Sequence, residues 1–208
     1  MRSHIATLID ASYNELSQNQ ETAMEIAGRK IGPKHPPLVI AEIGINHGGD
    51  IQVAKEMVRL AALSGCEMVK HQTHIIADEM TDEAKQIFPP NADVSIWEVM
   101  ERCSLGHDEE KALKDYTESL GMIWISTPFS RAAADFLETL DVPAYKIGSG
   151  EVDNLPLIRH IARKGKPVIM STGMQTIDSV RASVKILDDD HGRAHVEMAK
   201  AVYRAYME

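Results

Sequence analysis

Short apolar runs alternate with longer amphipathic stretches along most of this 208-residue chain. The runs are too short to form helices, and most of them lack the alternation of polar and apolar residues that marks a half-exposed strand. Parallel strands that are buried on both faces of a sheet show this pattern. The predicted strands occupy residues 38–43 (LVIAEI), 67–70 (EMVK), 122–126 (MIWIS), 144–147 (AYKI) and 167–170 (PVIM).

Amphipathic stretches follow the strands, and three of them begin with a good helix cap: Asp50, Ser130 and Thr176. The faces that we expect these helices to bury are Val53, Met57 and Leu60, then Ala133, Ala134 and Leu137, then Ile177, Val180, Val184 and Leu187. Strand and helix repeated five times predict a parallel α/β fold. The pattern alone leaves a (β/α)8 barrel and an open doubly wound sheet both possible.

The remaining segments suggest a division of the chain. Residues 24–32 read as a hairpin around Ala27-Gly28-Arg29, and residues 74–106 form an insertion whose length is typical of a functional loop. The acidic pair Asp78-Glu79 reads as solvated surface. We therefore expect an N-terminal helical extension (1–23), a capping hairpin and linker (24–37), the βα domain (38–187) and a divergent helical tail (188–208). His191 and His195 share a helix face in this tail, but the preferred interpretation is a solvated helix start.

Composition excludes several classes of partner. The formal net charge of −9 argues against nucleic acid, which requires a basic face. The two cysteines are too few for a disulfide scaffold and indicate a reducing cytoplasm. No apolar run approaches the roughly 20 residues of a membrane span, and residues 1–10 (MRSHIATLID) do not resemble a secretory signal. The expected location is therefore the cytoplasm.

Polar side chains gather where the predicted strands end. In parallel α/β folds these carboxyl ends carry the reactive groups. Lys70 and Lys146 emerge from buried strands, where an unpaired charge is costly, and so favour a functional role. The neighbouring serines and threonines suit either an anionic ligand or helix capping. The histidines His47, His71 and His74 are most simply ordinary core or loop residues. Together the strand ends predict a site for an anionic small molecule.

Six stretches in consecutive order give this site a more specific interpretation. They are AEIGINHGGD (41–50), VKHQTHIIADEM (69–80), NADVSIWEVMERC (91–103), GMIWISTPFSRAAADFL (121–137), PAYKIGSGEVDNLPLI (143–158) and GKPVIMSTGM (165–174). In sequence and spacing the chain resembles the N-acetylneuraminate (sialic acid) synthase family over residues 24–187. The resemblance implies a (β/α)8 TIM barrel, here truncated after about five βα units, with the hairpin capping its bottom. We then expect five adjacent parallel strands, with the first and fifth at the sheet edges.

The resemblance also implies an activity. The family are transferases that condense phosphoenolpyruvate with an N-acylated sugar such as N-acetylmannosamine, use manganese or another divalent metal, and act as homodimers. The positions that match phosphoenolpyruvate contacts are Lys70, Thr127, Lys146, Ser149 and Ser171. Those that match sugar contacts are Gln72, Asn91 and Glu151, and the candidate catalytic carboxylates are Glu42 and Glu151.

The chain also departs from the family. The two metal-binding histidines of the family lie on later strands, and no residue after Leu187 matches them. We therefore expect little synthase activity from this chain by itself. Two alternatives stay open beside the sialic acid synthase interpretation. One is an incomplete fragment that only binds a phosphate ligand or a partner. The other is a synthase of legionaminic or pseudaminic acid or, more distantly, of the eight-carbon 3-deoxy-octulosonate type.

Overall fold

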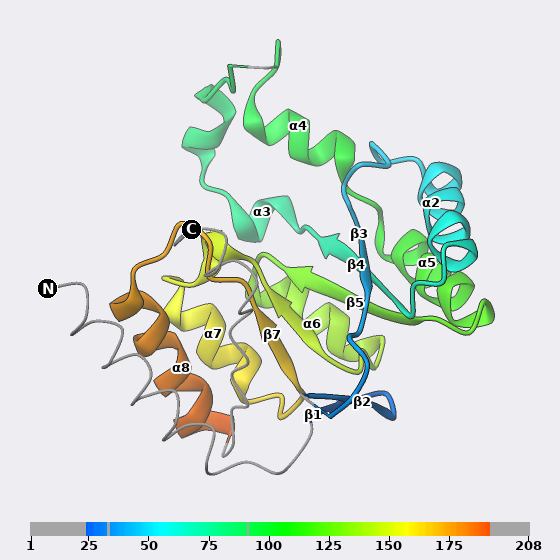
Figure 1. Ribbon diagram of the computed structural model, residues 1–208. Coiled ribbons are helices and arrows are strands. Elements are labelled where there is room, and N and C mark those ends of the chain that lie inside the picture. Colours follow the sequence, from blue (N-terminus) through cyan, green and yellow to red (C-terminus); the bar gives the residue numbers. More distant parts are fainter. Residues whose placement is uncertain (1–23, 33, 91, 192–208) are drawn as a thin grey trace, which may run out of the picture. The chain divides into compact units, whose positions relative to one another are not determined.

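The computed structural model of the chain describes residues 24–32, 34–90 and 92–191 (Figure 1). These residues belong to two compact units, which meet in the sequence between Pro37 and Leu38. No helix within the described ranges combines the length and the apolar character that a membrane span requires.

The first unit contains a β-hairpin. Its strands β1 (Met24–Ile26) and β2 (Arg29–Ile31) pair in an antiparallel manner. The turn residues Ala27 and Gly28 have φ angles of +50° and +80°. Two-residue hairpin turns favour this left-handed backbone because it matches the twist of the strands. Glycine adopts it freely, whereas the Cβ of Ala27 makes it costly there.

The second unit is built on one parallel sheet, as the sequence predicts. All neighbouring strands are parallel and follow one another in chain order, so that β3 and β7 are the two ends of the sheet among the described residues. The strands are β3 (Ile40–Gly44), β4 (Met68–Thr73), β5 (Ile123–Pro128), β6 (Tyr145–Ile147) and β7 (Val168–Met170).

Helices pack against one face of this sheet, and the core lies between them (Figure 1). The strands contribute alternate residues to this core, namely Ile43, Val69, Trp124, Tyr145 and Ile147. The helices that contribute buried residues are α2 (Ile51–Leu63), α5 (His107–Ser119), α6 (Arg131–Thr139), α7 (Leu155–Ala162) and α8 (Ile177–His191). The alternate strand residues between these, such as Lys70 and Lys146, point to the opposite face. Helices on a single face are the arrangement of a βα barrel, not of a doubly wound sheet.

The long insertion after β4 contains short helices of its own. They are α3 (Ile76–Glu79), the 3₁₀ turn η1 (Asp82–Gln86) and α4 (Ile96–Cys103). Ser95 and Glu98 form a reciprocal capping box that starts α4: the Glu98 N–H donates to the Ser95 hydroxyl, and the Ser95 N–H donates to the Glu98 carboxylate. The insertion is therefore a structured segment at the carboxyl end of β4.

The predicted buried face of α2 is wrong at two of its three residues, whereas the third, Met57, packs partly buried against the core, and the predicted cap is confirmed. The Asp50 carboxylate accepts hydrogen bonds from the N–H groups of Gln52 and Val53. Val53 and Leu60, however, are 44% and 49% exposed. The residues that α2 buries are Ala54, Val58 and Ala61. The helix is therefore rotated relative to the expectation, and it turns a face with two alanines and a valine toward the core.

We expect this rotation to appear in a matched pair of substitutions on α2. Val58 is fully buried, so Val58→Ala should lower the free energy of unfolding by about 2 kcal/mol through lost packing. Val53→Ala should change it by less than about 0.5 kcal/mol, because Val53 is half exposed. Both changes carry the same gain in helix propensity, which therefore cancels in the comparison. Urea denaturation measures both, and equal effects would contradict the observed rotation.

The caps of α6 and α8 are confirmed as well. The hydroxyl of Ser130 accepts a hydrogen bond from the N–H of Ala133 at 3.1 Å, and that of Thr176 accepts from the N–H of Ser179 at 3.1 Å. The predicted face of α6 is buried throughout. That of α8 is only partly so, since Leu187 is 3% exposed but Ile177 is 63% exposed. The first turn of α8 extends beyond the sheet-covering part of the helix.

Candidate active site

The predicted site residues on the strands lie on the face of the sheet opposite the helices. Glu42 on β3 is the register partner of Lys70 on β4, and Gln72 on β4 is the partner of Thr127 on β5. Lys146 on β6 lies on the same face, because its neighbours Tyr145 and Ile147 both face the helices and successive side chains of a strand point to opposite faces. The parallel register therefore brings side chains from four strands to one surface.

Lys70 and Glu42 form an ion pair across β3 and β4. The side chain of Lys70 is almost completely buried, at 7% exposed, whereas that of Glu42 is 57% exposed. A buried ammonium group requires a partner, and here the carboxylate supplies it. Glu42 therefore neutralises Lys70 as long as no anionic ligand competes for the lysine.

Lys146 joins β6 to the segment that follows β7. Its Nζ atom donates hydrogen bonds to the Ser171 hydroxyl at 2.7 Å and to the Ile147 carbonyl at 2.8 Å. Burial, and secondarily the positive charge of Lys70, lowers the pKa of Lys146 from 10.5 to about 8, while Glu42 opposes this shift. The two lysines thus lie close enough to repel each other. An anion placed between them would relieve this repulsion.

Three residues with hydroxyl groups, Thr127, Ser149 and Ser171, lie at the end of β5 and directly after β6 and β7. Thr127 is 1% exposed, and its hydroxyl has no hydrogen-bond partner among the described residues. A Cβ added at Gly148 would lie 3.7 Å from Thr127, and one added at Gly173 would lie 3.9 Å from Ser149, so the loops after β5, β6 and β7 approach one another. A buried hydroxyl without a partner is costly unless a ligand or water satisfies it. The five residues predicted to bind phosphoenolpyruvate thus lie on β4, β5 and β6 and directly after β6 and β7.

A sixth residue at these strand ends was not predicted. The amide Nε2 of Gln175 donates to the backbone carbonyl of Ser149 at 2.7 Å. It therefore ties the turn after β7 to the turn after β6. No periodicity marks Gln175 in the sequence, because its role depends on the pairing of two loops.

The residues predicted to contact a sugar are not joined to one another by the hydrogen bonds that the structure shows. Gln72 shares a 3.2 Å hydrogen bond with the ring nitrogen Nε2 of His74, and Glu151 accepts one from the Asn154 amide at 2.8 Å. Glu151 lies in the 3₁₀ turn η2 (Ser149–Glu151) directly after β6, next to Ser149. Asn91 lies outside the described residues, so its place relative to Gln72 and Glu151 stays a prediction.

The interpretation of Asp78-Glu79 as solvated surface is wrong for Glu79, whereas Asp78 is exposed as predicted. The Glu79 carboxylate pairs with Nδ1 of His74 at 2.8 Å, and its side chain is only 11% exposed. The Asp78 carboxylate accepts a hydrogen bond from the N–H of Ala132 at the start of α6. The Glu79 carboxylate therefore holds the start of the insertion together, and that of Asp78 connects the insertion to α6. The partner of Asp78 is 54 residues away in the sequence, so charge pattern alone did not indicate it.

A buried polar cluster lies behind β4 and β5, on the helix-covered side. Glu110 of α5 is 1% exposed, accepts a hydrogen bond from the Thr73 hydroxyl at 2.7 Å and lies 3.8 Å from His71. The Thr73 hydroxyl also contacts the Ser126 hydroxyl at 2.7 Å. Sequence reasoning missed Glu110 within the acidic stretch 108–110. Its helical spacing to two other buried residues, Leu113 and Thr117, was the available signal.

His47 and His71 stack in this cluster, with ring centroids 5.2 Å apart. Burial, and then the neighbouring His71, lowers the pKa of His47 to about 4. His47 is therefore neutral near pH 7. Its Nδ1 accepts a hydrogen bond from the Gly49 N–H, which fixes the tautomer with the proton on Nε2.

The described residues do not fit a divalent metal. Within these ranges no group of three or more His, Cys, Asp or Glu side chains has an arrangement that could hold one. His74 is already engaged by Glu79 and Gln72 on its two ring nitrogens. We therefore assign no metal ligand among His47, His71 and His74.

The lowered pKa of Lys146 predicts how the free energy of unfolding changes with pH. Between about pH 8 and 10.5 the unfolded chain keeps the proton that folded Lys146 has released. The unfolded state then binds more protons, so this group makes the free energy of unfolding rise with pH across that window. Denaturation at several pH values, compared between the natural chain and Lys146→Met, measures this contribution. A pH dependence that is identical in both proteins would contradict the lowered pKa.

A sheet of parallel strands with helices on one face, and with two lysines on the other, places the chain in the βα-barrel class. The sequence profile of the NeuB family matches residues 57–205. The chain therefore belongs to the NeuB family.

Individual relatives agree with this assignment. N-acetylneuraminate-9-phosphate synthase of Mus musculus is 35% identical over 165 residues, which are 77% of this chain and 45% of that protein. N,N'-diacetyllegionaminic acid synthase of Legionella pneumophila is 37% identical over 161 residues, 75% of this chain and 45% of that protein. The chain thus spans about half the length of the curated relatives it matches.

A solved structure agrees at the level of the fold. It is that of N-acetylneuraminic acid synthetase from Leptospira borgpetersenii in complex with citrate, and it superposes with a TM-score of 0.70 at 25% identity. The match covers 81% of this chain and 56% of that one. The fold class is therefore the (β/α)8 TIM-barrel type, and the described residues contain five of its βα units.

Proposed function

We propose that this chain provides the phosphoenolpyruvate-binding part of a sugar-acid synthase. The observation that carries the proposal is that Lys146 bonds to Ser171 and lies close enough to Lys70 to feel its charge. On β5, the strand between them, the buried hydroxyl of Thr127 has no partner among the described residues. Two ammonium groups and several hydroxyls suit a ligand that carries both a phosphate and a carboxylate. The names of the relatives, which are synthases of nine-carbon sugar acids, support the same class.

The proposed reaction joins phosphoenolpyruvate to an N-acylated amino sugar. The enol carbon attacks the aldehyde carbon of the open-chain sugar, water adds at the carbon that carries the phosphate, and inorganic phosphate leaves with cleavage of the carbon–oxygen bond. The products are a nine-carbon 2-keto sugar acid and phosphate. Preorganised positive charge stabilises the negative charge that moves during such a step.

The described residues have distinct roles in this proposal. Lys70 and Lys146 bind the anionic groups, while Thr127, Ser149 and Ser171 donate neutral hydrogen bonds. Entry of the ligand displaces Glu42 from Lys70, and the freed carboxylate is then next to the reacting atoms as a candidate proton carrier. Glu151, in the turn after β6, is the second catalytic candidate and a sugar contact, together with Gln72 and Asn91. We also propose a homodimer as the assembly and manganese as the metal, with ligands that are not among the described residues.

N-acetylmannosamine is the proposed sugar, and the legionaminic or pseudaminic acid precursors are the second candidates. The latter are supported by relatives with those names, which are 37% and 30% identical to the chain. The lysine and hydroxyl residues described above are the proposed contacts of phosphoenolpyruvate, which all these synthases share. The sugar specificity therefore depends on residues such as Asn91, and on contacts beyond those described.

Two measurements on the purified chain test the proposal. Calorimetric titration with phosphoenolpyruvate should give saturable binding, with 2-phosphoglycerate as a weaker competitor because it lacks the planar enol. A phosphate-release assay with manganese and each candidate sugar then distinguishes a synthase from a protein that only binds phosphoenolpyruvate. Binding with release supports a synthase, and the sugar that is consumed identifies its class. Binding without release supports a protein that only binds the ligand, and absence of binding would overturn both.

A further inference from the structure

Three side chains form a continuous hydrogen-bonded row where β4 ends and the insertion begins. Nδ1 of His74 contacts the Glu79 carboxylate at 2.8 Å, and Nε2 of the same ring contacts the side-chain oxygen Oε1 of Gln72 at 3.2 Å. The side chain of His74 is 1% exposed and that of Glu79 is 11% exposed, so both contacts are largely shielded from water. We call Glu79, His74 and Gln72 the histidine relay.

The ring of His74 is held in place on its flat side. It stacks on the ring of Phe129, with the two centroids 4.3 Å apart and 15° between the planes. The backbone N–H of Phe129 donates to the carbonyl of Thr73 at 3.4 Å, which keeps the segment after β5 beside the end of β4. The stacking therefore keeps Nδ1 directed toward Glu79 and Nε2 toward Gln72.

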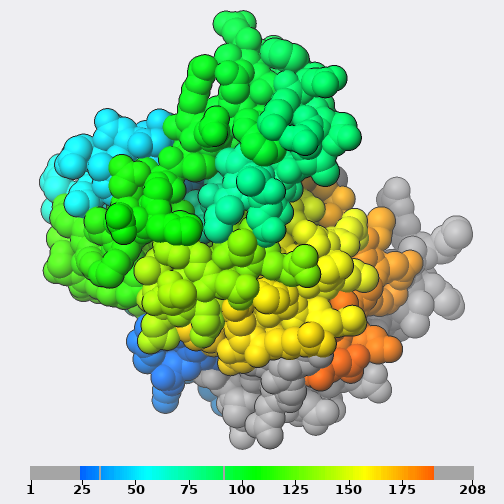
Figure 2. Space-filling model, turned by 180° about the vertical axis from the view of Figure 1, so that it is seen from behind, coloured from blue at the N-terminus to red at the C-terminus, as the bar shows by residue number. Residues whose placement is uncertain are grey.

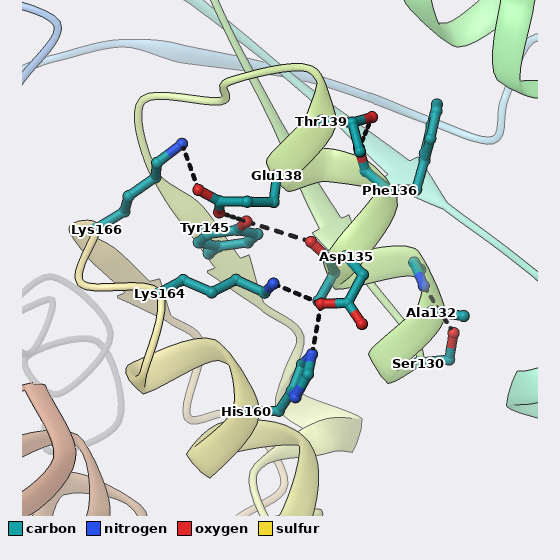
Figure 3. Close-up of polar contacts among 12 residues, drawn as sticks. Ser130, Ala132, Asp135, Phe136, Glu138, Thr139, Tyr145, His160, Lys164 and Lys166 are labelled. Atoms are coloured by element: carbon teal, nitrogen blue, oxygen red, sulfur yellow. Dashed lines mark hydrogen bonds and ion pairs between the residues drawn. The ribbon is translucent and has the colours of Figure 1, made fainter.

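The helix that carries Glu79 is supported from outside the insertion. Asp78 accepts a hydrogen bond from the Ala132 N–H of α6 at 3.1 Å, and Figure 2 shows the insertion (teal) resting on the surface that contains α6 (lime). Helix α6 is itself tied to the segment after α7, because Asp135 accepts a hydrogen bond from Lys164 at 2.6 Å (Figure 3). Glu79 is therefore presented to the ring by a braced segment.

The partners of His74 determine how many protons its ring carries. An ionised carboxylate only accepts hydrogen bonds, so Nδ1 must carry a proton to bond with Glu79. An amide oxygen also only accepts, so Nε2 must carry a second proton when Oε1 of Gln72 faces it. The ring in this arrangement is a cation paired with Glu79. When Nε2 has no proton, the Gln72 amide must turn over so that its NH2 group donates to the ring.

The same rotation exchanges the group that Gln72 presents away from the ring. With Oε1 on His74, the amide nitrogen Nε2 lies toward the turn after β3, where a Cβ added at Gly44 would be 3.6 Å from it. This NH2 group has no acceptor among the described residues. Gln72 is also the register partner of Thr127, and it shares the sheet face of Lys70. A free donor is thus available on the face that carries the candidate site.

We propose that Glu79 and His74 are positioning residues that set the hydrogen-bonding polarity of Gln72 toward the sugar. With His74 doubly protonated, Gln72 presents NH2 and suits an acceptor such as a carbonyl oxygen. With His74 neutral, it presents C=O and suits a hydroxyl or N–H donor. The part played by the sugar rests on the proposed function, whereas the coupling of the two side chains rests on their hydrogen bonds alone.

Glu79 is the titratable group through which this coupling operates. The side chains that contact the His74 ring are Gln72 from β4, Glu79 from α3 and Phe129 after β5, and of these three only Glu79 ionises. Lys70, two residues before Gln72 on the same strand, is paired with Glu42. The charge of His74 is therefore balanced within the relay.

Nuclear magnetic resonance of the histidine side chains tests the coupling without any ligand. Across a pH series, Nε2 of His74 should lose its proton while Nδ1 keeps its own, because Glu79 only accepts. Nuclear Overhauser contacts between the Gln72 amide protons and the His74 ring should strengthen over the same pH interval. A neutral His74 that is protonated on Nε2, or Gln72 signals that do not follow His74, would overturn the proposal.

Glu79→Leu should abolish the coupling. Without an acceptor at Nδ1, the neutral ring of His74 should keep its proton on Nε2 and continue to donate to Gln72, so the amide no longer turns over with pH. Asp135→Leu is the matched control, since Asp135 pairs with His160 at 2.7 Å on the outer surface (Figure 3). It should leave the relay unchanged, and circular dichroism should confirm that both variants are folded. Coupling that survives Glu79→Leu would also overturn the proposal.

The sugar provides a second arm. N-acetylmannosamine is titrated into the chain saturated with phosphoenolpyruvate, at a pH on each side of the His74 transition. Its affinity should be about tenfold lower once Nε2 has lost its proton, because the NH2 donor of Gln72 is withdrawn. Glu79→Leu should keep the higher affinity at both pH values, and the same pH dependence in both proteins would contradict the role of the relay.

The two arms fail in different ways. Absence of phosphoenolpyruvate binding would remove the proposed function, but the spectra of His74 and Gln72 would still decide whether the relay exists. Binding of phosphoenolpyruvate without coupling in the spectra would remove the relay and leave the proposed function in place.

Discussion

Replacing Lys146 with alanine should weaken phosphoenolpyruvate binding by about 1.5–3 kcal/mol, which is roughly a 10- to 150-fold increase in Kd. Lys146 donates to Ser171 and shares its surface with Lys70, so it contributes one of the two positive charges of the proposed site. Its ammonium group is already partly desolvated. Little further desolvation is required when the ligand binds, which makes the lost interaction large. Isothermal titration calorimetry near pH 7, where Lys146 is charged, measures the effect.

The same titration can show whether a loss of affinity comes from the missing charge of Lys146 or from a disturbed fold. Lys111→Ala on α5 removes an exposed lysine that pairs with Asp115, and it should leave phosphoenolpyruvate affinity unchanged. Lys146→Ala itself should not destabilise the protein, because it removes a buried charge whose pKa is lowered to about 8. Raising the pH through 8 should weaken binding in the natural chain but not in this variant. An unchanged affinity in Lys146→Ala would remove Lys146 from the site.

Replacing Gly49 with alanine should have the largest effect on stability, about 2–5 kcal/mol. Gly49 lies in the turn between β3 and α2 with a φ angle of +81°, where any Cβ is strained. A Cβ at this position would also lie 2.2 Å from the backbone carbonyl oxygen of Arg102, in the last turn of α4. Backbone atoms cannot rotate away as a flexible side chain can. The turn and α4 would therefore have to separate.

Gly48 is a matched control for this steric effect. Its φ angle is +60°, but a Cβ there would meet no atom within 4 Å. Gly48→Ala should therefore cost only the conformational strain, about 1–2 kcal/mol. Guanidinium denaturation of the two variants gives the difference, which is the contribution of the contact between Gly49 and Arg102. Equal destabilisation by both substitutions would show that the chain does not keep this close approach.

Much of the fold was predictable from sequence because it depends on local pattern. The five buried strands follow from short apolar runs, and their parallel arrangement follows from the amphipathic stretches between them. The caps Asp50, Ser130 and Thr176 are confirmed because each side chain bonds to a backbone group only two or three residues away. Lys70 and Lys146 could be recognised as candidate site residues because burying a lysine in a strand costs free energy unless its charge is paired.

Only the tertiary structure decided features that depend on partners distant in sequence. The core buries the small residue Ala54 of α2 and leaves the larger Val53 half exposed, so the size of the apolar side chains did not identify the buried face. Glu110 is buried because Thr73 lies opposite it, 37 residues away in the chain. The pairing of Lys70 with Glu42 and of Lys146 with Ser171 follows from strand register. Local periodicity specifies each strand and helix, but the energy of a polar contact depends on which segments the fold brings together.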